Sequence, residues 1–333
     1  MRILIDHNIN LLRSNIKAKG LFGTINRIRR GWAYALKGLP THIQIEITNR
    51  CNLSCPYCAA SRDIMKDSRY DMGFNEFKKI IDDLALKGNY YPSLQLAFRG
   101  EPFLNKDASM MIRYATGRNF YVTVSTNGLL LNKKLNNNLI NARLDYAIIS
   151  LDGVKKETYE KNRVGGKFDI LIENIKDLVS KKKEKKSKKP FIELQFIITR
   201  QTETEIEEFR RLGLALGVDN LRFKTYKLTC SKRSKDSVES LKAYLPIENR
   251  YSRYRIREDV LVPKVSPKSC SWASNCIICA DGEVVACCAD YNKSYVVGNV
   301  LKKDFWQVWN SSACVGLRAK IKKRELMICK DCS

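Results

Sequence analysis

Three cysteines, Cys51, Cys55 and Cys58, fall within one short stretch of the chain. One local disulfide cannot account for all three thiols, whereas thiolates are soft ligands that suit zinc or an iron–sulfur cluster. A structural zinc site usually closes its coordination with four ligands in two separated pairs, and no histidine follows these cysteines nearby. Three cysteines on a [4Fe–4S] cluster leave one iron open, and an open position is typical of a reactive metal site. The spacing therefore favours a reactive cluster, with a structural metal knuckle or buried free thiols as the alternative.

Alternating strand and helix patterns surround these cysteines and must position them. Strands are predicted at residues 42–47, 94–98, 120–125, 146–151, 191–198 and 221–223. Helical periodicity is found between them, at residues 75–87, 107–116, 132–142, 170–180 and 203–216. Repeated strand–helix units predict a parallel sheet with right-handed crossovers. Six such units predict an α/β fold with a partial (β/α)6 barrel rather than a complete eight-fold one.

Polar motifs follow four of these strands directly. The cysteines follow the first strand, and the other three strands end in the sequences Arg99-Gly100-Glu101-Pro102, Ser125-Thr126-Asn127-Gly128 and Ser150-Leu151-Asp152-Gly153. Each motif alone could be an ordinary turn, because Gly, Pro, Asn and Asp dominate turns. All four lie at the carboxyl ends of strands, which is the face of a barrel where ligands bind. Their shared position predicts one binding site.

The cysteines and these motifs together resemble the radical S-adenosylmethionine (radical SAM) superfamily. The signature of that family is C-x3-C-x2-C with an aromatic residue before the last cysteine, and Tyr57 stands in that place. Gly100-Glu101-Pro102 resembles the family's GGEP motif, which binds the methionine amino group of S-adenosylmethionine (SAM), with Arg99 in place of the first glycine. The resemblance implies that the three cysteines hold a [4Fe–4S] cluster to which SAM binds.

The same resemblance implies further contacts to SAM. Ser125 and Asn127 resemble residues that reach the ribose or the methionine carboxylate, and Ser150 and Asp152 resemble a motif near the ribose. Arg163 resembles an arginine that pairs with the SAM carboxylate, a task that suits a guanidinium because it binds carboxylates bidentately. A surface-loop arginine is the alternative for Arg163.

The C-terminal region is rich in cysteine. Asp281-Gly282 lies between strand-like residues 277–280 and 283–286, which predicts a β-hairpin. A four-thiolate site can form here from one cysteine before the hairpin, one cysteine after it and the terminal pair Cys329-x2-Cys332. Zinc held by four cysteines is the structural alternative.

This region also resembles the SPASM (or shorter twitch) domain of radical SAM enzymes. The matching features are Cys270 followed by Trp272, Gly282-x4-Cys287, Gly298-Asn299-Val300, Trp306-x2-Trp309 and the final Cys-x2-Cys. The larger form's extra C-x2-C-x5-C run is missing, so the resemblance implies one auxiliary [4Fe–4S] cluster, on Cys270, Cys287, Cys329 and Cys332. A two-residue turn would place Cys276 opposite Cys287, so Cys276 could replace Cys270, and Cys288 could replace Cys287.

Charge and composition restrict the partners. The chain has 333 residues and carries 60 Lys+Arg against 35 Asp+Glu, a formal net charge of +25. Such a field favours acidic partners, although solvated surface lysines explain much of it. The Lys-rich run at 181–189 has no interleaved aromatics to stack on bases, so no nucleic acid is expected. The basic, amphipathic residues 1–40 could dock on a membrane surface or a partner, or cover one end of the barrel.

Four regions are predicted along the chain. They are a basic helical N-terminal segment at 1–40, the radical SAM barrel at 41–225, a linker and loop region at 226–265 and the auxiliary-cluster domain at 266–333. Arg and Tyr in the linker could line a pocket for an anionic substrate, and Cys230 is expected to be a buried or free thiol. With no apolar run of about 18 residues and no signal-peptide pattern, twelve cysteines indicate a reducing, cytoplasmic compartment and metal ligation.

The resemblance implies an oxidoreductase that reductively cleaves SAM to a 5′-deoxyadenosyl radical, which abstracts hydrogen from a substrate. It also implies an electron donor such as flavodoxin or ferredoxin. Basic charge and modest length favour oxidation or epimerisation of a sugar, cyclitol or nucleotide-linked small molecule. Modification of a ribosomally made peptide is one alternative, although that branch usually adds an N-terminal peptide-recognition domain longer than residues 1–40. A non-catalytic iron–sulfur or zinc protein is the other. No catalytic acid or base is assigned; Glu46, Arg99 and Tyr226 are candidates for the barrel interior.

Overall fold

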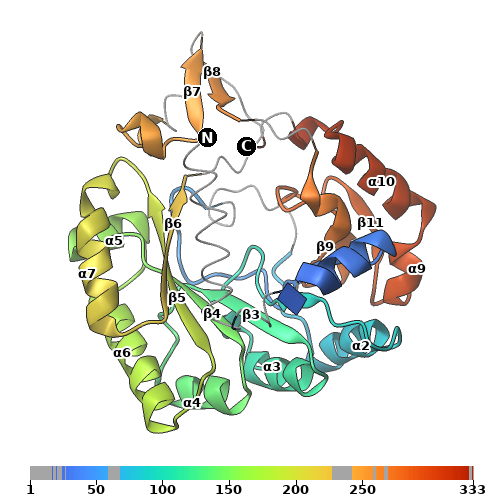
Figure 1. Cartoon of the computed structure of the whole chain (residues 1–333), viewed down its shortest axis with the longest axis horizontal. Coiled ribbons are helices and arrows are strands. Elements are labelled where there is room, and N and C mark those ends of the chain that lie inside the picture. The colour runs from blue at the N-terminus through green and yellow to red at the C-terminus, as the bar shows by residue number, and fades with distance from the viewer. Residues whose placement is uncertain are drawn as a thin grey trace.

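The computed structural model describes residues 17, 20, 25–26, 28–58, 68–226, 242–257, 260–265, 269–329 and 332. Its centre is one nine-stranded sheet with the strand order β11-β10-β9-β1-β2-β3-β4-β5-β6. The sheet curves around the middle of the molecule, and helices cover its outer side (Figure 1). Cys230, which was expected to be a buried or free thiol, lies outside the described residues.

The six strands expected of the barrel are present with helices between them, and strands β1 to β6 pair in parallel in sequence order. These strands are β1 His42–Ile45, β2 Ser93–Gln95, β3 Tyr121–Thr126, β4 Tyr146–Ser150, β5 Phe191–Ile198 and β6 Asn220–Thr225. The helices between them are α2 Phe74–Ala85, α3 Ala108–Gly117, α4 Lys133–Asn141, α6 Phe168–Glu184 and α7 Ile206–Leu216, with one short helix, α5 Lys156–Asn162, that the periodicity did not predict. The predicted partial barrel is confirmed.

Alternation along the strands decides which side chains reach the interior. In β3, Val122 and Val124 belong to the core between sheet and helices, and Ser125 lies on the opposite face. Helices present apolar residues to the same core at helical spacing, as α2 does with Phe77 and Ile81. Polar residues at the carboxyl ends of the strands are therefore directed toward the centre of the barrel.

The C-terminal region continues the barrel's sheet. Strand β9 (Asn275–Ile278) pairs in parallel with β1 and antiparallel with β10 (Glu283–Val285), which pairs with β11 (Val296–Asn299). The predicted hairpin is confirmed, and Gly282 occupies its turn with a positive φ of 82°. Helices α9 (Phe305–Trp309) and α10 (Ser312–Lys323) follow.

The register of this hairpin differs from the one expected. Val284 lies opposite Ile278 and Val285 opposite Ile277, so the turn contains three residues instead of two. A shift of one residue moves a side chain to the other face of a sheet. Cys276 is accordingly fully buried in the core with Ile278, on the face away from Val285. The expectation that Cys276 would lie opposite Cys287 is wrong for this reason.

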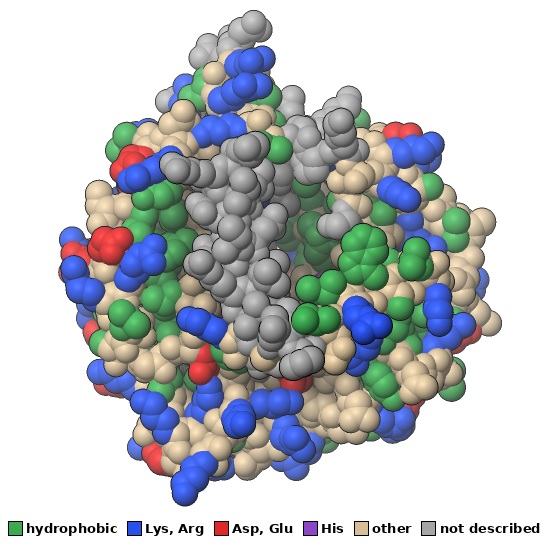
Figure 2. Space-filling view, viewed as in Figure 1, with side chains coloured by type: hydrophobic (Ala, Val, Ile, Leu, Met, Phe, Trp, Pro, Cys, Tyr) green, Lys and Arg blue, Asp and Glu red, His purple; other side chains and the backbone are tan. Residues whose placement is uncertain are grey.

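Two further segments complete the described structure. Residues 249–263 contain a short 3-10 helix, η4 Asn249–Tyr251, and an antiparallel hairpin of β7 Tyr254–Arg257 and β8 Val260–Pro263. Residues 28–36 are helical and pack through Tyr34, whose ring centroid lies 4.9 Å from that of Tyr90. Trp32 on this helix is 69% exposed. Lys and Arg side chains are spread around the visible face rather than gathered in one groove (Figure 2), and none of the described helices combines the length and apolar character needed to cross a bilayer.

Candidate active site and metal centres

The loop after β1 brings Cys51, Cys55 and Cys58 together. Cys55 is buried, and the other two thiols are half-buried. Burial raises the pKa of Cys55 to about 11, the Arg163 guanidinium opposes this shift, and Cys58 and Cys51 are close enough to raise it further. A thiol buried in this way keeps its proton near neutral pH unless a cation binds it, and a bound metal deprotonates its thiol ligands outright. The donor set therefore fits an iron–sulfur cluster.

Gly100 and Glu101 pack directly against this loop. A Cβ at position 100 would lie 2.2 Å from the Thr48 carbonyl oxygen and 2.6 Å from that of Arg50, so only glycine fits there. The Glu101 amide donates to the Arg50 carbonyl over 2.7 Å. Pro102, which is buried, starts the 3-10 helix η2 (Pro102–Leu104). The loop after β2 is thereby fixed to the residues that lead into the three cysteines.

The Glu101 carboxylate joins β2 to the end of β3. It is almost completely buried and accepts hydrogen bonds from Thr126 Oγ1 and from the Asn127 amide, both at 2.7 Å. Asn127 Nδ2 in turn donates to Asn52 Oδ1 in the cysteine loop over 2.8 Å. Burial raises the pKa of Glu101, and these donors oppose the rise. The structure thus unites two predicted residues, Glu101 and Asn127, and adds Thr126, which the motif alone did not single out.

A second polar group lies at the end of β4. Asp152 Oδ2 accepts a hydrogen bond from Tyr57 OH over 3.1 Å and is 2.5 Å from Arg163 Nη2, while Oδ1 accepts the Ile197 amide over 2.9 Å. Arg163 Nη1 lies 3.9 Å from Cys55 Sγ. Arg163 is therefore held in the site and is no surface-loop arginine. Ser125 is half-buried and Ser150 is buried, each at the end of its strand.

The Tyr57 ring closes one side of this group. Its centroid lies 6.0 Å from that of Tyr226 and 5.7 Å from that of Tyr244. These rings pack with Leu245 and Tyr254 in a small apolar cluster separate from the main core. Apolar packing beside the cysteine loop excludes water from this side of the site.

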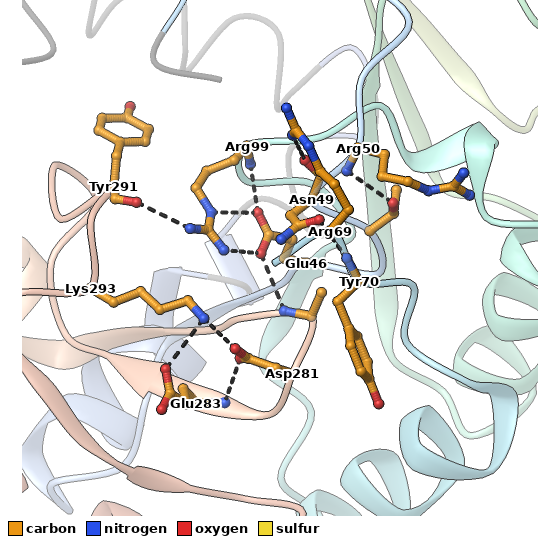
Figure 3. A network of polar contacts seen from close by, with 12 residues as sticks. Glu46, Asn49, Arg50, Arg69, Tyr70, Arg99, Asp281, Glu283, Tyr291 and Lys293 are labelled. Atoms are coloured by element: carbon orange, nitrogen blue, oxygen red, sulfur yellow. Dashed lines mark hydrogen bonds and ion pairs between the residues drawn. The ribbon is translucent and has the colours of Figure 1, made fainter. Parts of the chain in front are cut away.

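Glu46 and Arg99 form a buried ion pair between the barrel and the C-terminal hairpin (Figure 3). Both side chains are 0% exposed. Glu46 Oε2 lies 2.7 Å from Arg99 Nη2 and also accepts the Ala280 amide over 3.2 Å, while Arg99 Nη1 donates to the Tyr291 carbonyl over 3.1 Å. Both residues were candidates for the barrel interior. Their position shows a structural connection: Arg99, which replaces a glycine of the motif, ties the loop after β2 to the segment after β10.

A separate cavity of about 880 Å³ lies within the C-terminal region. The four cysteines expected to ligate an auxiliary cluster all line it, and they are Cys270, Cys287, Cys329 and Cys332. Arg324 Nη2 donates to the carbonyls of Cys329 and Cys332 over 2.8 and 2.7 Å, which fixes the terminal cysteine pair. The pKa of Cys270 is raised by burial and by the other three thiols. The cavity and its donor set fit a four-thiolate cluster.

The remaining described cysteines divide clearly. Cys288 lines the same cavity and is in hydrogen-bond contact with Cys287, so it stays an alternative ligand. Cys276 and Cys314 are fully buried in the main core, and Cys279 is buried close to Glu46. Among the residues that the structure describes, no three His, Cys, Asp or Glu side chains are close enough to hold a single metal ion.

Comparison with known proteins agrees with this geometry. Residues 45–213 match the family model of the radical SAM superfamily, and residues 270–333 match that of the SPASM iron–sulfur cluster-binding domain. The chain is 26% identical over 317 residues to the tungsten-containing aldehyde ferredoxin oxidoreductase cofactor-modifying protein of Pyrococcus furiosus, covering 88% of this chain and 87% of that protein. It is 27% identical over 265 residues to the PqqA peptide cyclase of Granulibacter bethesdensis, covering 74% and 67%.

The solved structures show the same fold. SuiB of Streptococcus suis, bound to precursor peptide SuiA, superposes with a TM-score of 0.62 at 15% identity, over 90% of this chain and 72% of that chain.

Proposed function

Because the chain belongs to the radical SAM superfamily and carries a SPASM iron–sulfur cluster-binding domain, we propose that it is a maturase that modifies a ribosomally made peptide. Family membership gives the cofactors: SAM, the [4Fe–4S] cluster that binds it, and an auxiliary cluster. The observation that carries the peptide proposal is the match to a peptide cyclase over 74% of this chain. This match supports a peptide over the small-molecule substrate expected from charge and length.

When bound, the SAM-binding cluster and SAM together supply the 5′-deoxyadenosyl radical that abstracts hydrogen from the substrate. We assign Cys51, Cys55 and Cys58 as the ligands of that cluster. We assign the Glu101 carboxylate as the acceptor for the SAM amino group. The carboxylate is buried, and none of the groups that donate hydrogen bonds to it is charged. An ammonium group beside it would favour its ionised form. Gly100 lets the loop after β2, which carries Glu101, pack against the Thr48 and Arg50 carbonyls.

The remaining site residues position and shield the reacting groups. Arg163 lies between Asp152 and the thiol of Cys55, where its guanidinium can meet the SAM carboxylate. Asp152 holds that guanidinium in place, and the phenol of Tyr57 completes the contact. We place Ser125 and Ser150 at the ribose, and Asn127 beside the cysteine loop. Cys270, Cys287, Cys329 and Cys332 hold the auxiliary cluster in the C-terminal cavity.

The experiment is an anaerobic assay of the reconstituted enzyme with SAM, a reductant and a panel of synthetic precursor peptides. The proposal predicts peptide-dependent formation of 5′-deoxyadenosine and a change in peptide mass. Cys55→Ala is the matched control, because it removes one ligand of the SAM-binding cluster and leaves the C-terminal cavity intact. Steady 5′-deoxyadenosine formation with every peptide unchanged, and a sugar or cyclitol oxidised in its place, would overturn the proposal.

A second candidate is modification of an enzyme cofactor. It is favoured by the relative named as a cofactor-modifying protein, which aligns over 88% of this chain and 87% of its own length. The same assay distinguishes the two, because a cofactor-modifying enzyme would change a cofactor extract and leave the peptides unaltered.

A further inference from the structure

Lys224 is a charged residue on the inner face of β6 that the SAM site does not use. Its neighbour Phe223 packs toward the helices, 5.2 Å from the Phe209 ring of α7. Alternation along the strand therefore directs Lys224 to the opposite face, toward the centre of the barrel. In the sheet it lies beside Ile197 of β5. The Ile197 amide donates to Asp152, so Lys224 borders the polar group at the end of β4.

Two carboxylates, Glu193 and Asp152, act on the charge of Lys224, and both are bound to other side chains. Glu193 is 0% exposed; its Oε2 accepts hydrogen bonds from Tyr146 OH at 2.6 Å and Asn220 Nδ2 at 2.7 Å, and its Oε1 forms an ion pair with Arg222 Nε at 2.9 Å. Asp152 is held by Arg163 and Tyr57. Each acid thus forms its ion pair with an arginine, Arg222 or Arg163, and neither forms one with Lys224.

The side chain of Lys224 has neither a hydrogen bond nor an ion pair with the part of the chain that the structure describes. Burial lowers its pKa to about 8, Arg222 and Arg253 lower it further, and Glu193 and Asp152 act in the opposite direction. A half-buried ammonium group without an ion-pair partner is only partly hydrated, which costs free energy. A ligand anion placed beside it removes that cost, and the half-buried side chain remains accessible to one.

We propose that Lys224 binds a carboxylate of the peptide substrate, so that the enzyme acts on acidic peptides. This proposal rests on the proposed peptide-maturase function. A carboxylate is the anion that an unmodified peptide carries, in Asp, Glu or its C-terminus. Bound to Lys224, it would anchor the peptide next to Asp152 and thus close to SAM. The overall charge of +25 brings such a peptide toward the enzyme.

Binding measured without turnover tests the proposal. The probe is a fluorescein-labelled peptide of alternating Glu and Gly, titrated with the SAM-loaded holoenzyme and followed by fluorescence anisotropy. Its matched partner has every Glu replaced by Gln and its C-terminus amidated. We expect Lys224→Met to weaken binding of the Glu peptide about tenfold, as for loss of a hydrogen bond between charged groups. Lys224→Arg should restore most of the affinity.

Lys133→Met is the control variant, because it removes the same charge from an exposed position on α4. It should change the dissociation constant less than twofold. Equal affinity of wild-type enzyme for the Glu and Gln peptides would overturn the proposal without any variant. A Lys224→Met enzyme that keeps its peptide affinity but binds SAM more weakly would also overturn it, because Lys224 would then bind the SAM carboxylate. Failure of the maturase function alone would appear differently, as selective binding of the Glu peptide with no change in the mass of any peptide.

Discussion

Replacing Glu46 with Gln should lower the free energy of unfolding by about 3–5 kcal/mol, because the Arg99 guanidinium then remains buried without a counter-charge. The Glu46 and Arg99 side chains are 0% exposed. The carboxylate accepts from the backbone amide, Nε and Nη2 of Arg99 at 3.0, 2.9 and 2.7 Å, and from the Ala280 amide at 3.2 Å. The amide nitrogen of Gln cannot accept a hydrogen bond. The two donors that bond to the replaced carboxylate oxygen therefore lose their acceptor.

The assay is urea unfolding of the reconstituted protein under anaerobic conditions, followed by far-ultraviolet circular dichroism. The control is Asp169→Asn, which breaks the surface pair between Lys156 and Asp169, whose side chains are 54% and 67% exposed. That pair should contribute less than about 1 kcal/mol. The double variant Glu46→Met/Arg99→Leu should regain more than half of the loss, because replacing both buried charges with apolar residues is often nearly neutral. A Glu46→Gln protein no less stable than the control would show that Arg99 does not depend on a buried counter-charge.

Four further predictions follow from the site. Cys55→Ala should abolish 5′-deoxyadenosine formation and reduce the iron content from about eight to about four per chain, whereas unchanged cleavage would remove the SAM-binding assignment. Gly100→Ala should weaken SAM binding by about 1–3 kcal/mol, roughly 5- to 150-fold in titrations, because its methyl group would meet the Thr48 and Arg50 carbonyls; an unchanged dissociation constant would contradict this. Cys270→Ser should lose the auxiliary cluster and Cys276→Ser should keep it, as measured by iron content, because Cys270 lines the C-terminal cavity and Cys276 does not; the reverse result would restore Cys276 as a ligand. Affinity for the Glu peptide should be highest below pH 8 and fall at higher pH, because the Lys224 ammonium loses its proton above a pKa of about 8; a flat profile from pH 7 to 10 would exclude this ion pair.

The sequence predicted the features that depend on local spacing. The three cysteines, the order of strands and helices and the polar residues after each strand follow from periods of two and 3.6 residues and from turn composition. Because carboxyl ends of parallel strands meet at one edge, the prediction also placed Glu101 and Asn127 in one site, where they are hydrogen-bonded.

Features that depend on distant pairing could not be predicted in this way. The pairing of β1 with β9 joins His42 to Asn275, and no local pattern encodes it. The one-residue difference in the hairpin turn moved Cys276 into the core, because strand register is sensitive to turn length. The Glu46–Arg99 pair required knowledge of which loops meet. Lys224 was missed because a lysine in a short strand is indistinguishable by sequence from one at a solvated edge.

The assignment as a radical SAM peptide maturase is tested most directly by iron and sulfide content combined with an anaerobic turnover assay on a precursor peptide. We predict about eight irons per chain in two four-iron clusters, 5′-deoxyadenosine that forms only with SAM and reductant, and a peptide product of altered mass. Zinc in place of iron, or no 5′-deoxyadenosine from the reduced and reconstituted protein, would contradict it.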